Sequence, residues 1–378
     1  MTLPLSDAKP DAPAVPIMRP LLPTAERVLP YLRQLDANRW YSNNGPLERQ
    51  FRARVADHLD MPEAGVVTVS SGTMGLVVAL MATGAEPGVR SGGRCLMPSW
   101  TFAATPVAAR MAGLAPHFAD VRADDWALDA EAVPGRTDLD DVAAFMPVAP
   151  FGYPLAVAPW ERLADETGIP VVIDAAACFD AVGQCPPARP QRQPVVISLH
   201  ATKAFGLGEG GLILTRDLDL AERCRRIANF GFTGARSAEL PGANAKLSEY
   251  HAAVGLAVLD GWSEQRAQWQ RVTALYAQAL GGCDGIALSP GFNDGWVSSF
   301  LNVRCTPDAE GLRGRLDAQA IGWRRWWERG CHTMPAFADA GRDPLPVTER
   351  LANEVVGLPF SPDLDGATVD RVVAAVTG

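Results

Sequence analysis

The fold is decided by residues 195–211, VVISLHATKAFGLGEGG, in which an apolar strand-like run leads to Lys203 and then to a glycine-rich turn. A second apolar run, residues 171–174, lies upstream and ends in Asp174. Helical or loop stretches separate these runs from further strand candidates at residues 66–69, 94–97, 144–148 and 211–215. This alternation predicts a mostly parallel sheet flanked by helices.

Lys203 and Asp174 would both lie near strand ends, at the edge of an open α/β sheet where ligands bind. An amine there can form a Schiff base with an aldehyde, and a carboxylate can keep a ring nitrogen protonated. Pyridoxal phosphate needs this pair of groups, and its pyridinium would stabilise an aspartate in apolar surroundings. Taken alone, Asp174 could instead cap a helix.

Two other strand ends carry candidate ligand contacts. Ser71-Gly72-Thr73 follows the strand candidate at residues 66–69 and precedes an apolar helical stretch. Its N–H groups would suit a phosphate, although an ordinary helix N-cap explains the same serine. Phe102 follows the strand candidate at residues 94–97, where it could stack on a flat cofactor or belong to the core.

Several function classes are excluded by composition and motifs. The glycine-rich turn leads into an apolar strand rather than a helix, which excludes a dinucleotide fingerprint. The motifs of P-loop nucleotide hydrolases, zinc proteases and serine hydrolases are absent. A net charge of -9 argues against nucleic-acid binding. The seven scattered cysteines and the lack of long apolar runs indicate a cytoplasmic protein that does not enter a membrane.

Three regions are expected along the 378 residues. They are a proline-rich leader at residues 1–20, a large domain at 21–260 and a small α+β domain at 261–378. The last region is set apart because six of the ten tryptophans lie in it. A helix should follow residue 215, and another should begin near Ser248.

Eight segments, in their order and spacing, resemble the DegT/DnrJ/EryC1/StrS family of sugar aminotransferases, which belongs to the fold type I pyridoxal phosphate enzymes. The resemblance runs nearly end to end and implies an α/β, aspartate aminotransferase-like fold: a large domain with a mostly parallel mixed sheet and a smaller α+β C-terminal domain. The segments are 43–46 (NNGP), 71–73 (SGT), 101–105 (TFAAT), 173–176 (IDAA), 198–203 (SLHATK), 208–211 (GEGG), 242–246 (GANAK) and 358–360 (LPF).

The resemblance implies a role for each matching residue. Lys203 would bind pyridoxal 5′-phosphate covalently and carry protons, and Asp174 would pair with the ring nitrogen. The phosphate and ring would also be held by Gly72, Thr73, Met74, Phe102 and Ser198. Asn244 would reach the cofactor phosphate of a neighbouring protomer, which implies at least a homodimer with a shared active site. Substrate contacts would come from Asn43, His200 and Lys246, which lie in the matching segments. His332 lies outside these segments and is a further candidate substrate contact.

Two positions depart from the family pattern. Ala177 stands where the family often has a glutamine that contacts the cofactor's phenolic oxygen, so that contact is in doubt. Ala245-Lys246 replaces the common tyrosine-arginine pair. Together with His200, this pattern resembles the branch that acts on 4-keto-6-deoxy sugars linked to a nucleotide diphosphate. The retained Lys203 favours amino transfer over the dehydratase branch, in which histidine replaces it.

The expected activity is transfer of an amino group from glutamate to the keto group of a nucleotide-linked sugar. A carbocyclic ketone such as an inosose is an alternative acceptor, because the cofactor chemistry would be identical. A regulatory homologue without activity is the other alternative, against which Lys203 and Asp174 argue. Candidate contacts for the diphosphate are Lys246, Arg236, Arg325 and His332. The stretch 323–327, WRRWW, could line the same pocket or pack at an edge of the small domain.

Overall fold

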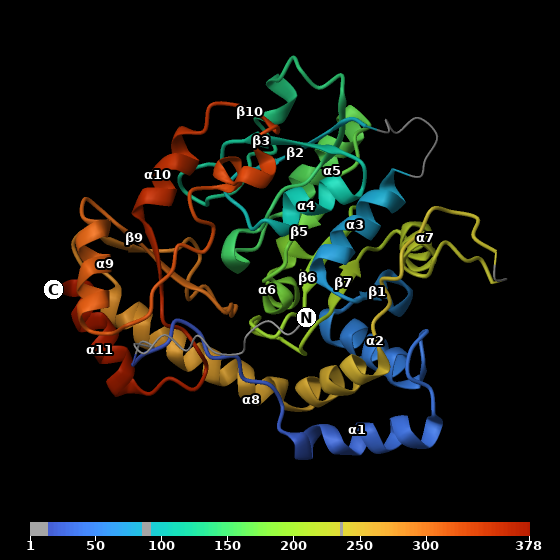
Figure 1. Cartoon of the computed structure of the whole chain (residues 1–378), viewed down its shortest axis with the longest axis horizontal. Helices are drawn as coiled ribbons and strands as arrows, with labels where there is room; N and C mark the ends of the chain where they lie inside the picture. The colour runs from blue at the N-terminus through green and yellow to red at the C-terminus, as the bar shows by residue number, and fades with distance from the viewer. Residues whose placement is uncertain (1–13, 85–91, 235–236) are drawn as a thin grey trace.

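The computed structural model describes residues 14–84, 92–234 and 237–378. Two four-stranded sheets, in the orders β10-β3-β2-β4 and β1-β7-β6-β5, form its centre (Figure 1). Backbone hydrogen bonds between residues 145–149 and 170–174 join the sheets edge to edge. Neighbouring strands are parallel except for β7, which is antiparallel to β1 and β6. The strands are β1 (Val66–Val69), β2 (Arg94–Pro98), β3 (Ala115–Ala119), β4 (Val142–Phe145), β5 (Ile173–Asp174), β6 (Val195–Ser198), β7 (Gly211–Leu214) and β10 (Gly341–Arg342).

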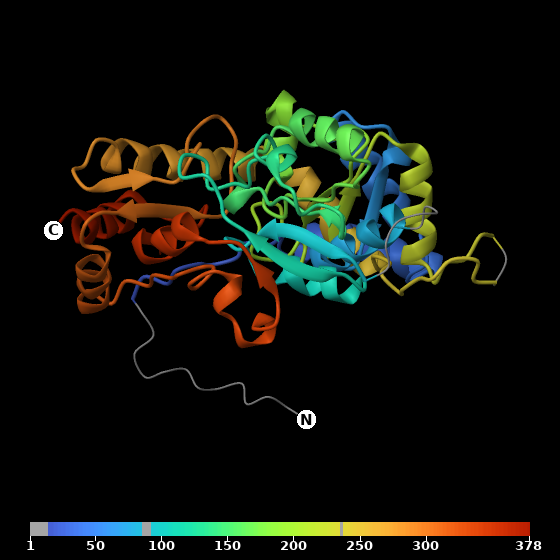
Figure 2. The ribbon, with the colours of Figure 1, turned by 90° about the horizontal axis from the view of Figure 1, so that it is seen from above.

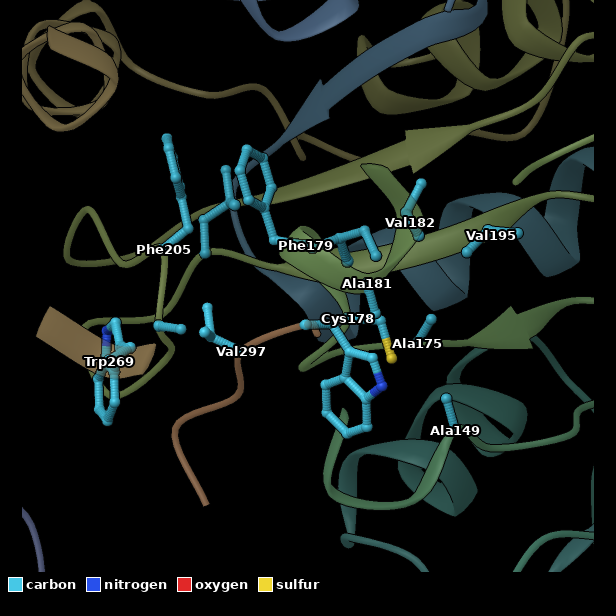
Figure 3. Close-up of a cluster of buried hydrophobic side chains, with 14 of the residues drawn as sticks. Ala149, Ala175, Cys178, Phe179, Ala181, Val182, Val195, Phe205, Trp269 and Val297 are labelled. Carbon is cyan, nitrogen blue, oxygen red and sulfur yellow. The ribbon is translucent and has the colours of Figure 1, made fainter. Parts of the chain in front are cut away.

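Both faces of most of this central layer are buried, which explains why most of its strands are nearly continuously apolar rather than alternating. Val195 and Val196 illustrate this, because successive side chains of a strand point to opposite faces and these two belong to different cores. One core includes α3, α4 and α7, and the other includes α2, α5, α6 and α8. Figure 3 shows part of the second core, around Phe179 and Phe205. The helices are α2 (Pro46–Leu59), α3 (Gly72–Thr83), α4 (Ala104–Met111), α5 (Val157–Thr167), α6 (Phe179–Gln184), α7 (Leu218–Ala228) and α8 (Glu249–Leu280).

The C-terminal unit, residues 281–378, adds β10 to the central layer and contains an antiparallel sheet of its own in the order β11-β9-β8. Its long neighbour α8 contacts α1 and α2 at one end of the molecule and α11 and β8 at the other. The expected boundary at residues 260/261 therefore falls inside a continuous helix. The remaining elements are α1 (Ala25–Asn38), β8 (Ile286–Leu288), β9 (Leu301–Cys305), α9 (Ala309–Ala318), α10 (Pro346–Glu354), β11 (Val355–Leu358) and α11 (Gly366–Thr377).

The mixed, mostly parallel sheet agrees with the sequence prediction, and each of the six predicted strands is present. Strand β1 has the predicted ends, whereas the ends of the other five differ from the prediction. Helix α8 begins where expected, since the Ser248 hydroxyl accepts a hydrogen bond from the His251 N–H (3.2 Å). The seven cysteines are free. Among the helices in the described ranges, none is long and apolar enough to cross a membrane.

Candidate active site

A cavity of about 510 Å³ lies at the carboxyl ends of the central strands. Parallel strands end at the same edge of a sheet, so polar residues that follow them are brought together. Seven of the predicted site residues line this cavity: Gly72, Thr73, Phe102, Asp174, Ser198, His200 and Lys203. Ala177 lines it too.

The first turn of α3 forms one wall of the cavity. The Ser71 hydroxyl accepts a hydrogen bond from the Met74 N–H (3.1 Å), so Ser71 is the N-cap. The N–H groups of Gly72 and Thr73 find no acceptor within the described parts of the chain. Helix N-termini with free N–H groups bind anions, so the cap and the phosphate interpretations of this motif are compatible.

A glycine at position 72 allows this turn to approach the end of β6. A Cβ atom added to Gly72 would lie 2.8 Å from Cβ of Ser198, which is too close for two carbon atoms. Gly211, at the start of β7, has the same relation to Ser71, with an added Cβ 2.8 Å from the Ser71 carbonyl carbon. The two glycines therefore bring the free N–H groups beside the Ser198 hydroxyl.

Asp174 ends β5 and is only 4% exposed. Its carboxylate accepts hydrogen bonds from the Thr105 hydroxyl (2.7 Å) and the Ala176 N–H (3.2 Å). The hydroxyl groups of Thr101 and Thr105 are 2.7 Å apart. Because the Thr105 hydroxyl donates its hydrogen to Asp174, it accepts a hydrogen bond from the Thr101 hydroxyl. Burial raises the pKa of Asp174, and the two hydrogen bonds and the charge of Lys203 act in the opposite direction. A cation in the cavity would stabilise this buried carboxylate further.

Lys203 lies on the loop between β6 and β7, with its N–H bonded to the His200 carbonyl (2.9 Å). Its Nζ is 4.9 Å from the centre of the Phe300 ring. Burial lowers the pKa of Lys203, while nearby Asp174 acts in the opposite direction. A neutral amine is therefore available at a lower pH than for a solvated lysine. Phe300 was not singled out from the sequence, because it follows no pattern that marks a ligand contact. Thr105 belongs to the quoted segment 101–105, but no role was assigned to it.

Arg325, predicted as a diphosphate contact, also lines the cavity. The remaining predicted residues that the structure describes do not line it. Lys246 donates a hydrogen bond to Oδ1 of Asn244 (2.7 Å). His332 is buried, with Nδ1 2.7 Å from Oγ of Ser99. Arg236 lies outside the described residues. The residues away from the cavity are Asn43, Met74, Asn244, Lys246 and His332.

We call the part of the cavity wall formed by Met18, Phe151 and residues 324–328 the outer part; it carries aromatic and charged side chains, and most of it comes from the C-terminal unit. Phe300, beside Nζ of Lys203, lines the cavity as well. Trp327 stacks on Phe151, with ring centres 3.8 Å apart. Nε of Arg325 is buried and has no hydrogen-bond partner among the described residues. Its guanidinium approaches a carboxylate only at 3.8 Å, and that residue, Glu310, is exposed.

Comparisons with known proteins agree with this architecture. A match to the DegT/DnrJ/EryC1/StrS aminotransferase family covers residues 24–377. The chain is 32% identical over 359 residues to the dTDP-3-amino-3,4,6-trideoxy-alpha-D-glucose transaminase of Streptomyces venezuelae, covering 91% of this chain and 89% of that protein. It is 26% identical over 374 residues to the dTDP-4-amino-4,6-dideoxy-D-glucose transaminase of Escherichia coli, covering 96% of this chain and 98% of that protein.

A solved structure with the same fold is DesI, crystallised in the presence of its TDP-sugar product. It matches with a TM-score of 0.84 and 31% sequence identity, over 97% of this chain and 93% of that one. The predicted aminotransferase fold is thereby confirmed. Because the family match extends across nearly the whole sequence, the chain belongs to the DegT/DnrJ/EryC1/StrS aminotransferase family.

Proposed function

We propose that this aminotransferase, which uses pyridoxal 5′-phosphate, moves an amino group from glutamate to the keto group of a nucleotide-linked 4-keto-6-deoxy sugar. The observation that carries the proposal is that Lys203, Asp174 and the free N–H groups of Gly72 and Thr73 meet in one cavity. Those are the three kinds of group that this cofactor requires for its aldehyde, ring nitrogen and phosphate. Both transaminase relatives are named for dTDP-linked amino sugars, which supports the acceptor class.

The residues present fit the cofactor. Bound pyridoxal phosphate supplies a ring that accepts electrons from the substrate. Asp174 would hold the proton on the ring nitrogen, and the buried hydrogen bonds from Thr105 and Ala176 keep its carboxylate in one orientation. The α3 N-terminus and the Ser198 hydroxyl would bind the phosphate. Phe102 would lie against the ring.

Lys203 would act both as the covalent anchor and as the group that moves protons. Its Nζ has no hydrogen-bond acceptor in the described residues, so it is free to turn toward a reacting carbon. A general base must be unprotonated to accept a proton, and burial favours the unprotonated form by lowering the pKa of Lys203. The same Nζ would then return the proton to the neighbouring carbon.

The direct test of the proposal is to incubate the purified protein with glutamate and a panel of ketones, and to follow 2-oxoglutarate. The panel should contain keto sugars on several nucleotides and an inosose. We expect turnover with a nucleotide-linked 4-keto-6-deoxy sugar. Preference for the carbocyclic ketone would replace this acceptor by the alternative one, and a protein without turnover would be the silent regulatory homologue.

The free cysteines support the proposed cytoplasmic location.

Arg325→Gln is expected to raise the KM for the nucleotide-linked sugar by about tenfold or more, with a smaller effect on kcat. A partly buried guanidinium without a close carboxylate attracts an anion, and a diphosphate would supply it. Tenfold corresponds to about 1.4 kcal/mol of lost binding. Steady-state kinetics with a varied sugar concentration measures the effect. Arg329→Gln is the matched control, because Arg329 is exposed and is not part of the cavity wall. Equal effects of the two variants would reject the diphosphate role of Arg325.

We propose a homodimer in which Asn244 completes the neighbouring protomer's site. Phe102 supports this proposal, because it lines the cavity yet is 62% exposed in the single chain. Asn244 supports it as well, since it lies away from the cavity of its own chain.

Mixing the Lys203→Ala and Asn244→Ala variants tests the shared site. A mixed dimer would have one site with both changes and one intact site, so co-refolding or subunit exchange should restore activity that neither variant shows alone. Up to about half of the wild-type activity per mixed dimer is expected. Mass spectrometry should show that the sample contains mixed dimers. If its activity then equals only the sum of the activities of the Lys203→Ala and Asn244→Ala proteins, Asn244 acts in its own chain's site or in no site.

A further inference from the structure

The N-terminal segment before α1 is attached to the C-terminal unit. We call residues 14–19 the strap. The Val15 N–H donates to the Ala320 carbonyl (3.2 Å), and the Val15 carbonyl accepts from the Gly322 N–H (2.8 Å). The Val15 side chain is 5% exposed. The strap therefore pairs with the chain just before the basic and aromatic stretch of the cavity wall (Figure 2).

The strap is also held on both sides of Met18. The Ile17 carbonyl accepts a hydrogen bond from the Phe360 N–H (3.2 Å). Arg19 lies 3.8 Å from a carboxylate oxygen of Asp363. Met18, between these two attachments, lines the cavity. Its position is thus set by backbone pairing on its N-terminal side and reinforced by an exposed ion pair on its C-terminal side.

Gly322 makes this attachment possible. A Cβ atom at position 322 would lie 2.7 Å from the Ile17 nitrogen and 3.1 Å from the Val15 carbonyl oxygen. Any side chain there would push the strap away. Since Arg324 and Arg325 follow two and three residues later, the strap and the basic wall are parts of one local structure.

Met18 gives the outer part of the cavity an apolar contact among charged and aromatic groups. Phe300, Trp326 and Arg325 line the same cavity. A thioether side chain is flexible and adapts to irregular apolar surfaces, so it suits a ligand that presents an apolar face rather than a row of hydroxyl groups. A deoxygenated sugar has such a face.

We infer that Met18 is a specificity-determining residue that contacts the sugar acceptor but not the amino donor. This inference rests on the proposed function. Both substrates must bring their reacting carbon to Lys203, so both occupy the inner part of the cavity. Only the nucleotide-linked sugar, which is several times larger than glutamate, would extend to the strap. The two substrates are thereby distinguished by a residue outside both the sheet and the cofactor contacts.

Met18→Trp tests the inference, because the larger ring would occupy space that the acceptor needs. We expect the KM for the keto sugar to rise by about tenfold or more, with a change of less than about twofold in the KM for glutamate. Met18→Gln, which preserves length but places an amide in the cavity, should raise the acceptor KM by about threefold or more. It provides the test if the tryptophan variant does not fold. Leu21→Trp is the matched control, since Leu21 is 46% exposed and does not line the cavity.

Each outcome is informative. An unchanged acceptor KM in folded Met18→Trp or Met18→Gln would overturn the inference and leave the proposed function intact. Equal increases in the KM for glutamate and for the sugar would overturn it as well, because Met18 would then affect the whole cavity. A wild-type protein that aminates none of the nucleotide-linked sugars would overturn the proposed function first, and the role of Met18 with it.

Discussion

Lys203→Ala is expected to lower turnover by about 10⁴-fold or more, which corresponds to roughly 5 kcal/mol of transition-state stabilisation. The variant loses both the covalent anchor and the amine that moves protons, and the described residues that line the cavity offer no second lysine to replace it. Two measurements check this. The rate of 2-oxoglutarate formation should fall to background, and the absorption of the covalently attached cofactor near the visible edge should disappear.

Lys203→Arg is the control that distinguishes loss of the positive charge from loss of the reactive amine. A guanidinium keeps the positive charge near Phe300 but stays protonated, so it can neither attack an aldehyde nor accept a proton. We therefore expect the arginine variant to be as inactive as the alanine variant. The melting temperature of both variants should be measured, so that unfolding is not mistaken for lost chemistry. Wild-type turnover by either folded variant would refute the role assigned to Lys203.

Asp174→Ala is expected to lower turnover by about 10³-fold, or roughly 4 kcal/mol, in protein saturated with cofactor. Without a carboxylate beside it, the ring nitrogen loses its proton more easily and the ring becomes a poorer electron acceptor. The proposed phosphate contacts at the α3 N-terminus would be unaffected, so the protein should still bind cofactor. Cofactor content by absorbance, measured together with the rate, separates weak binding from slow chemistry.

Thr105→Val gives a graded comparison for Asp174. Valine has a similar shape but cannot donate the hydrogen bond that Asp174 accepts from Thr105 (2.7 Å). Because that bond holds the pKa of Asp174 down, its loss should reduce the ionised fraction and lower turnover by about tenfold. The expected order is wild type, then Thr105→Val, then Asp174→Ala. An Asp174→Ala protein that is saturated with cofactor and turns over like wild type would exclude the proposed pairing.

The strands that build the site were predictable, whereas some of their neighbours were not. The runs at residues 171–174 and 195–199 are apolar and β-branched because both of their faces are buried. Strand β3 has the sequence APHFA, in which Pro116 and His117 interrupt the apolar run, so it was missed. Strand β10 has only two residues and pairs with β3 from far along the chain, which local periodicity does not reveal.

The division into regions shows the same contrast. The tryptophan-rich part of the sequence begins near Trp262, which suggested a domain boundary there, but helix α8 continues through this point to Leu280. Amino-acid composition therefore does not show where a helix ends. Part of the predicted leader, residues 14–17, is tied to the C-terminal unit by backbone hydrogen bonds to residues 320, 322 and 360, and these depend on contacts more than 300 residues apart.

By itself, the sequence determined six strands of the central layer and the placement of Lys203, Asp174 and the Ser71-Gly72-Thr73 turn near the ends of these strands. Such placement follows from local order, because each residue comes directly after a buried strand or in the loop beyond it and parallel strands end on one side. Only the tertiary structure decided the hydrogen bond from Thr105 to Asp174, the placement of Phe300 beside Nζ of Lys203, and the wall that contains Met18 and Arg325. Those contacts join residues far apart in the chain, and their geometry depends on side-chain packing that no local pattern specifies.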